Sequence, residues 1–126
     1  MATVTVKKEE RLISALFVQK DGCYYGSSEI DPWDEERNAM VYNGINPVIA
    51  HPPCQLWGAL AFVNYKRWGG EHNKPENDGG MFKFALDTVN RCGGVLEHPA
   101  RTRARVKYGI EKPVKGCWTR SGNLID

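Results

Sequence analysis

The sequence lacks the features of a membrane or secreted protein. None of its apolar runs approaches the roughly 18 residues that a membrane-spanning helix needs. No signal peptide is visible, because charged residues interrupt the N-terminal segment at Lys7, Lys8, Glu9 and Glu10. An internal repeat and a low-complexity segment are also absent, which excludes solenoid and fibrous architectures. These absences predict a cytoplasmic protein without membrane contact.

The sequence has four cysteines, at Cys23, Cys54, Cys92 and Cys117. Without a secretory signal, we expect reduced thiols rather than a disulfide framework. His51, Cys54, Cys92 and His98 are the residue types that bind zinc. However, Cys92 ends a predicted helix and a strand separates it from His98, so the geometry is poor. We therefore predict no metal site and do not expect zinc.

The remaining composition is that of a globular domain. Hydrophobic residues make up 41% of the 126 residues and charged residues 25%, and a chain of this length can bury a core without covalent staples. We predict a flexible N-terminal segment over residues 1–11 and a single α/β domain over residues 12–126.

Charge is spread unevenly along the chain. Five acids accompany one base between Glu29 and Asn38, whereas seven bases accompany one acid between Pro99 and Arg120. A basic segment suits phosphate or nucleic acid. A solvated surface, or contact with the acidic stretch of a second copy in a homodimer, are the alternatives. The segment begins with three alternating arginines, which share one face on a strand but spread around a helix: Arg101, Arg103 and Arg105.

Hydrophobic periodicity predicts alternating strands and helices. Apolar runs predict buried strands over 12–18, 48–50 and 95–96, and a short strand over 23–25. Asp31-Pro32 predicts the start of a helix over 32–42. Helices are also predicted over 56–68 and, behind a cap at Asn77 or Asp78, over 81–92, where Gly93-Gly94 ends the helix. This alternation predicts a short, mainly parallel sheet flanked by helices.

Two segments at predicted strand ends carry the candidate chemistry. The strand over 48–50 runs into His51-Pro-Pro-Cys54, and a rigid Pro-Pro turn can hold a thiol in one direction for nucleophilic attack. The strand over 95–96 ends at Glu97, where partial desolvation would raise the pKa of the carboxyl group. Carboxyl ends of parallel strands meet at one sheet edge, so we expect Cys54 and Glu97 to lie close together, with Trp57 lining the same cleft. The alternatives are a buried structural thiol and a structural carboxylate.

These segments resemble the catalytic core of cytosine C5 DNA methyltransferases, with Pro53-Cys54-Gln55 as the nucleophile motif and Val95-Leu96-Glu97 as the strand with the catalytic glutamate. The resemblance implies a reduced Rossmann, methyltransferase-like fold. It also implies that Cys54 attacks C6 of a flipped cytosine, that Glu97 steadies N3, and that S-adenosylmethionine supplies the methyl group. The implied cofactor contacts are Phe17, Asp21, Gly22 and Asp31. The predicted substrate or nucleic-acid contacts are residues near the two strand ends and the arginines of the basic segment: His51, Gln55, Trp57, His98, Arg101, Arg103 and Arg105.

Over a longer range, from Ala15 to Trp118, the chain resembles small bacteriophage proteins of unassigned function. They share runs like Val48–Cys54 and Gly93–Pro99. This resemblance implies a reduced methyltransferase core that binds a nucleotide or DNA in the cytoplasm of a host cell and acts in DNA modification or counter-defence. The alternative is a binding module without catalysis that inhibits a host defence protein or sequesters a nucleotide signal.

Overall fold

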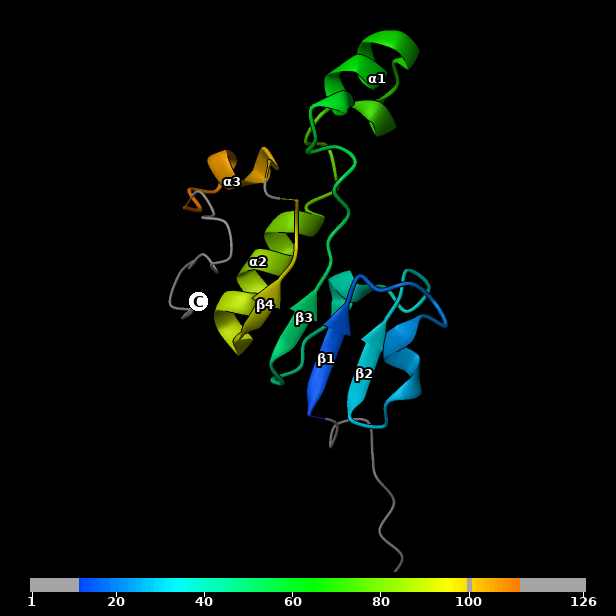
Figure 1. Ribbon diagram of the computed structural model, residues 1–126, viewed down its shortest axis with the longest axis vertical. Coiled ribbons are helices and arrows are strands. Elements are labelled where there is room, and N and C mark those ends of the chain that lie inside the picture. Colours follow the sequence, from blue (N-terminus) through cyan, green and yellow to red (C-terminus); the bar gives the residue numbers. More distant parts are fainter. Residues whose placement is uncertain (1–11, 100, 112–126) are drawn as a thin grey trace, which may run out of the picture.

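The computed structural model describes residues 12–99 and 101–111 and shows a four-stranded parallel sheet with helices, which confirms the predicted α/β class (Figure 1). The strands are β1 (Ile13–Leu16), β2 (Ile30–Trp33), β3 (Val48–Ala50) and β4 (Gly94–Leu96). The α-helices are α1 (Leu60–Trp68), α2 (Met81–Cys92) and α3 (Ala104–Lys107). Three 3₁₀ turns complete the list: η2 (Cys23–Gly26), η3 (Ala39–Val41) and η4 (Glu71–Asn73).

The strand order β2-β1-β3-β4 places a change of direction between β1 and β3. After β1 the chain first adds β2 on one side and then crosses back to add β3 and β4 on the other. At the carboxyl end of this junction the backbone N–H of His51 donates to the carbonyl of Leu16, 3.0 Å away. Open parallel sheets bind ligands at such a topological switch point, so the fold itself directs attention to the residues that follow β1 and β3.

One face of the sheet packs against α2. Leu16, Val48 and Ala50 are fully buried on this face and form a cluster with Ala85 and Val89 of α2. The apolar positions of α2 recur at helical spacing, as predicted, so one stripe of the helix covers β3 and β4 (Figure 1). This packing fixes the relative positions of the two strands that lead into the candidate site.

Two predicted elements are wrong, both around β2. Residues 32–42 do not form one helix, because Ile30–Trp33 pair with β1 as an edge strand. An edge strand tolerates Pro32, whose missing N–H is not needed on the open side. The turn that follows is stabilised by Asp34, whose Oδ1 accepts from the N–H of Arg37 at 2.8 Å. Residues 23–26 form the 3₁₀ turn η2 instead of the predicted short strand.

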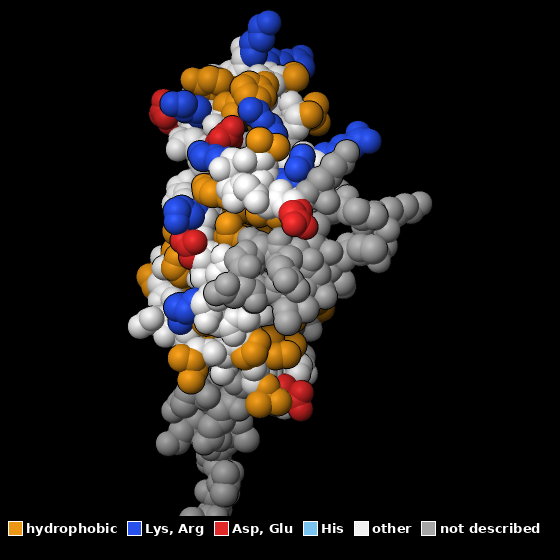
Figure 2. All heavy atoms as spheres, turned by 90° about the vertical axis from the view of Figure 1, so that its left-hand side faces the viewer, with side chains coloured by type: hydrophobic (Ala, Val, Ile, Leu, Met, Phe, Trp, Pro, Cys, Tyr) orange, Lys and Arg blue, Asp and Glu red, His pale blue; other side chains and the backbone are white. Residues whose placement is uncertain are grey.

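Helix α1 lies away from the sheet, at the upper end of the molecule in Figure 1, and its main contacts are with η4. Only Ala61 of this helix is buried, while Leu60 and Trp68 are each 71% exposed. Figure 2 shows hydrophobic side chains with lysines and arginines between them at this end. Within the described part of the chain, no helix is long and apolar enough to cross a membrane.

Candidate functional site

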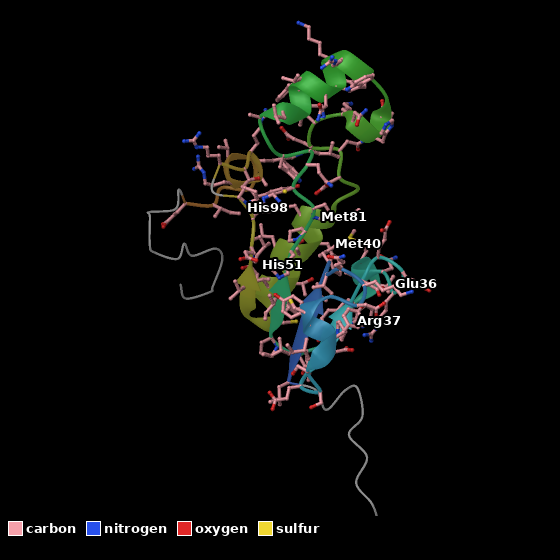
Figure 3. The ribbon with its side chains drawn as sticks, turned by 45° about the vertical axis from the view of Figure 1, so that its right-hand side comes forward. Glu36, Arg37, Met40, His51, Met81 and His98 are labelled. Atoms are coloured by element: carbon pink, nitrogen blue, oxygen red, sulfur yellow. The ribbon has the colours of Figure 1, made fainter. Side chains whose placement is uncertain are left out.

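The two segments singled out in the sequence line one cleft at the carboxyl edge of the sheet. The cleft has a volume of about 670 Å³. The backbone N–H of Glu97 donates to the carbonyl of Ala50 at 2.9 Å, so the residue after β4 is tied to the end of β3. Figure 3 shows His51 and His98 beyond the ends of these strands. The lining residues are His51, Pro52, Pro53, Cys54, Gln55, Glu97, His98 and Pro99, which confirms that Cys54 and Glu97 share one cleft.

Cys54 stands at the start of a turn and presents its thiol to solvent. The carbonyl of Cys54 accepts from the N–H of Trp57 at 3.0 Å, and Pro52 is buried beneath the turn. The thiol itself is free and exposed. The expectation of a buried structural cysteine is therefore not met, and the side chain is accessible to a ligand in the cleft.

Glu97 belongs to a chain of three side chains from three different segments. Its Oε2 lies 2.8 Å from Nδ1 of His51. The other ring nitrogen of His51, Nε2, lies 2.7 Å from the hydroxyl of Tyr24, which belongs to η2. The Glu97 side chain is 69% exposed and that of His51 29%, so the carboxylate end of the chain is open to the cleft while the imidazole is shielded.

Tyr24 was not expected at the site, because 27 positions separate it from His51 in the sequence. Burial and, to a smaller extent, the neighbouring Cys23 and Glu97 raise the pKa of the Tyr24 phenol above its usual value. The hydroxyl therefore stays protonated at neutral pH. The only sequence signal is the position of η2, which follows the first strand and so must lie near the carboxyl edge of the sheet.

His98 lines the same cleft and contacts the core. Its Nε2 is 3.4 Å from the carbonyl of Pro53, and its ring centroid is 4.8 Å from that of Phe82. Burial lowers the pKa of His98, and the hydrogen bond to Pro53 and the charge of Asp78 only partly oppose this effect. His98 is therefore a neutral side chain at physiological pH, and its contacts connect the cleft to the core.

Trp57 does not line the cleft, so that prediction is wrong. Its side chain is 0% exposed and packs against Phe82 and Tyr108. The indole N–H donates to Oδ2 of Asp78 at 3.0 Å. A tryptophan three residues after Cys54 points inward because the turn at Cys54 reverses the chain before it. Gln55, in contrast, lines the cleft, and its contact with a substrate stays a prediction.

The three arginines after the cleft play different parts. They do not lie on a strand, since Arg103 precedes α3 and Arg105 belongs to it. The guanidinium group of Arg103 lies 3.4 Å from Glu76 and 4.1 Å from the ring centroid of Phe62. Within residues 12–99 and 101–111, Arg101 and Arg105 make no ion pair. Of these three arginines, Arg101 and Arg105 are therefore the two that are free to contact a phosphate. The basic residues beyond position 111 lie outside the described residues.

The four residues considered for zinc do not come together. Cys92 ends α2, before β4 begins, and its Sγ contacts the carbonyl of Gly44 at 3.4 Å. It thus lies at the amino end of β4, opposite the cleft. In the described part of the chain, no group of three or more His, Cys, Asp or Glu side chains is placed to hold a metal ion.

The residues implied for S-adenosylmethionine do not fit that cofactor as they lie. Both carboxylate oxygens of Asp31 already accept hydrogen bonds, Oδ1 from Arg37 at 2.6 Å and Oδ2 from the indole of Trp33 at 3.1 Å. The ring of Phe17 packs edge-on against Phe84. Asp21 occupies a turn with a φ of 57°. Asp31 is only 6% exposed, so its carboxylate is not open to a ribose hydroxyl, and the chemistry considered below uses only side chains of the cleft.

Comparisons with protein-family models, with curated proteins and with solved structures found no match to this chain.

Proposed function

We propose that the cleft binds the base of a nucleotide or nucleic acid, with Cys54 as the nucleophile toward C6 of a pyrimidine and Glu97 as the hydrogen-bonding partner of its N3 edge. The single observation that supports this function best is the shared cleft, which brings an exposed thiol and an open carboxylate to one sheet edge. The fold fits it too, because the strand order is one that doubly wound nucleotide-binding sheets use around their switch point.

The shape and walls of the cleft suit a base. Its volume of about 670 Å³ lies within the range of small-molecule sites. Pro52, Pro53 and Pro99 contribute apolar surface against which the face of a base can pack. Gln55 and Glu97 contribute hydrogen-bonding groups at the same wall. A flat base with a hydrogen-bonding edge therefore matches the walls of the cleft.

The proposed nucleophilic step needs no cofactor. The Cys54 thiol loses its proton to solvent, and the thiolate sulfur forms a bond to C6 while the C5–C6 double bond opens. C5 then takes up a proton from solvent. Loss of the original C5 proton restores the double bond, breaks the S–C6 bond and releases the thiolate. The net result is exchange of the C5 hydrogen of the pyrimidine with solvent hydrogen, and this exchange is a direct test for nucleophilic catalysis.

The test combines binding with exchange. Calorimetry with dCMP, a short cytosine-containing single strand and S-adenosylmethionine measures affinity, and NMR in D₂O follows loss of the C5–H signal. We expect binding of dCMP or the strand, exchange by the wild type, and no exchange by Cys54→Ser. Cys23→Ser is the matched control, since Cys23 is also an exposed thiol but does not line the cleft. Absence of binding to all nucleotides and strands would overturn the proposal.

A binding module without catalysis is the second candidate. It is favoured by the state of Asp31, whose carboxylate is buried and bound by Arg37 and Trp33 and so is not open to a methyl donor. Such a module would hold a nucleotide signal or the nucleic acid of a defence system in a phage-infected cell. Cys54→Ser would then leave affinity unchanged, and the wild type would bind dCMP without exchanging its C5 hydrogen.

A further inference from the structure

Helix α1 exposes most of its apolar side chains. Five of its nine residues are large apolar residues that are 37 to 71% exposed: Leu60, Phe62, Val63, Tyr65 and Trp68. Figure 2 shows these hydrophobic side chains gathered at the upper end of the molecule, with lysines and arginines between them. Soluble monomers rarely leave a contiguous apolar surface open, and such a surface usually belongs to a site for a partner.

The surface around α1 is positively charged. Residues 58–75, which contain α1 and η4, carry three bases, Lys66, Arg67 and Lys74, against one acid, Glu71. Within residues 12–99 and 101–111, Lys66 and Arg67 form no ion pair. Two copies that paired through α1 would bring these like charges together. Charge complementarity therefore favours an anionic partner over a second copy of the chain.

The cations and the apolar side chains alternate around α1. Residues four apart lie next to each other on a helix, so Lys66 adjoins Phe62 and Arg67 adjoins Val63. A helix that lies in a lipid interface instead separates a charged face from an apolar one. Of the anionic partners, a lipid surface therefore fits α1 less well than a chain that presents phosphates and flat apolar groups in turn.

Three aromatic side chains follow one another along α1. Phe62, Tyr65 and Trp68 stand at three-residue steps, about 4.5 Å apart along the helix axis. Cations lie over two of these rings, Arg103 at 4.1 Å from the centroid of Phe62 and Arg67 at 5.4 Å from that of Trp68. Trp68 is the most exposed of the three, at 71%. Aromatic rings interleaved with cations suit single-stranded nucleic acid, because bases stack on the rings while phosphates contact the cations.

We infer that α1 is a stacking surface for single-stranded nucleic acid, with Trp68 as its main platform and Lys66 and Arg67 as phosphate contacts. The surface is continuous with the cleft, since only residues 55–59 separate Cys54 from α1 and Arg103, which follows the cleft wall, contacts Phe62. We expect nucleotides that flank a base in the cleft to lie on α1. That last expectation rests on the proposed function, whereas stacking on α1 does not.

An abasic strand separates stacking from charge, because it keeps the phosphates and lacks the bases. Fluorescence anisotropy measures the affinity of the full chain for labelled oligo(dA) of about 12 nucleotides, for an abasic strand and for a duplex of the same length. We expect the wild type to bind oligo(dA) about tenfold more tightly than the abasic strand. Trp68→Ala should remove this preference and leave duplex affinity unchanged, while Trp68→Phe should keep most of the preference.

Ile45→Ala is the matched control, because Ile45 is 87% exposed but precedes β3, at the opposite edge of the sheet from the cleft. It should bind all three probes as the wild type does. Replacing Lys66 and Arg67 with glutamine should weaken binding of oligo(dA) and of the abasic strand alike. It should also reduce the slope of affinity against salt by about one unit for each lost phosphate contact, and an unchanged slope would overturn the role of these two cations.

Equal wild-type affinity for oligo(dA) and the abasic strand, or oligo(dA) affinity that survives Trp68→Ala, would overturn the stacking surface. So would Trp68-dependent binding to phosphatidylserine vesicles without binding of oligo(dA), or a dimer on a sizing column that Trp68→Ala dissociates. Oligo(dA) contains no pyrimidine and dCMP is too short to span both sites, so the two probes report separately. If oligo(dA) binds through Trp68 while dCMP and cytosine strands gain nothing from the cleft, the proposed function fails and the stacking surface stands.

Discussion

Gly94 passes so close to Val48 that a Cβ atom built on it would lie 1.9 Å from the Val48 carbonyl oxygen. Its φ of 125° is also one that side-chain-bearing residues rarely adopt. Gly94→Ala must therefore separate β3 from β4, and we expect it to lower the free energy of unfolding by about 2 to 4 kcal/mol. Urea denaturation measures this loss. Because Glu97 follows β4 directly, nucleotide affinity should fall with it.

Gly58→Ala is the control for that substitution. A Cβ at Gly58 meets no atom within 4 Å, and the residue does not have a positive φ. We expect the control to unfold at nearly the wild-type urea concentration. Equal stability losses in the two variants would mean that the close approach of β4 to β3 is not what requires Gly94.

Asp78 supports both the start of α2 and the buried indole of Trp57. Its Oδ1 accepts from the N–H of Gly80, while Oδ2 accepts from the N–H of Phe82 and from Nε1 of Trp57, all at 2.9 to 3.0 Å. Asp78→Ala should cost about 2 to 4 kcal/mol, because it leaves two backbone N–H groups at the start of α2 and the buried indole N–H without their acceptor. Denaturation followed by tryptophan fluorescence measures it. Asp87→Ala, which removes only an exposed pair with Lys83, should leave the free energy of unfolding almost unchanged.

His98 makes stability depend on pH. Burial lowers its pKa in the folded protein, so the unfolded chain binds a proton more readily than the folded one. The free energy of unfolding should therefore decrease as pH falls below the unfolded value of about 6.5 and level off below the folded pKa. Denaturation between neutral and mildly acidic pH measures the slope. The slope in that window should flatten in His98→Gln, and an unchanged slope would assign the effect to other groups.

Tyr25 and Asp34 titrate as a pair on the surface. The 2.6 Å hydrogen bond to Asp34 raises the pKa of Tyr25 to about 12 and helps to lower that of Asp34. The stabilisation of the folded state by Tyr25 is thus present below its unfolded pKa and is lost as pH rises toward 12. The stabilisation by Asp34 is lost as pH falls through its lowered pKa. Ultraviolet titration should show one tyrosine with a late midpoint. Asp34→Asn should return it to the usual range of about 10.

Phosphate contact should depend on Arg101 and Arg105, since Arg103 is engaged by Glu76. Replacing both free arginines with glutamine should weaken binding of a single strand and reduce the slope of affinity against salt by about one unit for each lost contact. Affinity for dCMP should change far less. Lys83→Gln, on the outer surface of α2, is the control. A salt slope that stays the same in the double variant would place the phosphate contacts elsewhere.

The strands and helices with clear hydrophobic periodicity were predictable from the sequence. The structure confirms the strands at 48–50 and 95–96, and helix α2 begins near the cap expected at Asp78. The region around β2 was not predictable, because Asp31-Pro32 is as good a helix start as it is an edge strand. Local sequence cannot tell that Asp31 is buried and bound by Arg37 and Trp33.

The candidate site was predictable only as far as strand ends determine it. The rule that carboxyl ends share an edge correctly placed Cys54 and Glu97 in one cleft. The inward rotation of Trp57 depends on the turn at Cys54 and on the distant Asp78. The bond between Tyr24 and His51 likewise depends on how η2 folds over the edge of the sheet. Neither contact can be predicted from the hydrophobic periodicity of the sequence.

The chain leaves the body of the protein after Leu56 to build α1 and η4, and returns at Glu76, whose N–H donates to the Leu56 carbonyl at 2.8 Å. We expect a closed excursion of this kind to open as a unit of its own. A nine-residue helix is marginal on its own, so the amide hydrogens of α1 should exchange by local opening, well before those of the sheet. Since its two ends already meet, residues 58–75 are also the segment that evolution or design can shorten, lengthen or replace at little entropic cost while the cleft stays assembled.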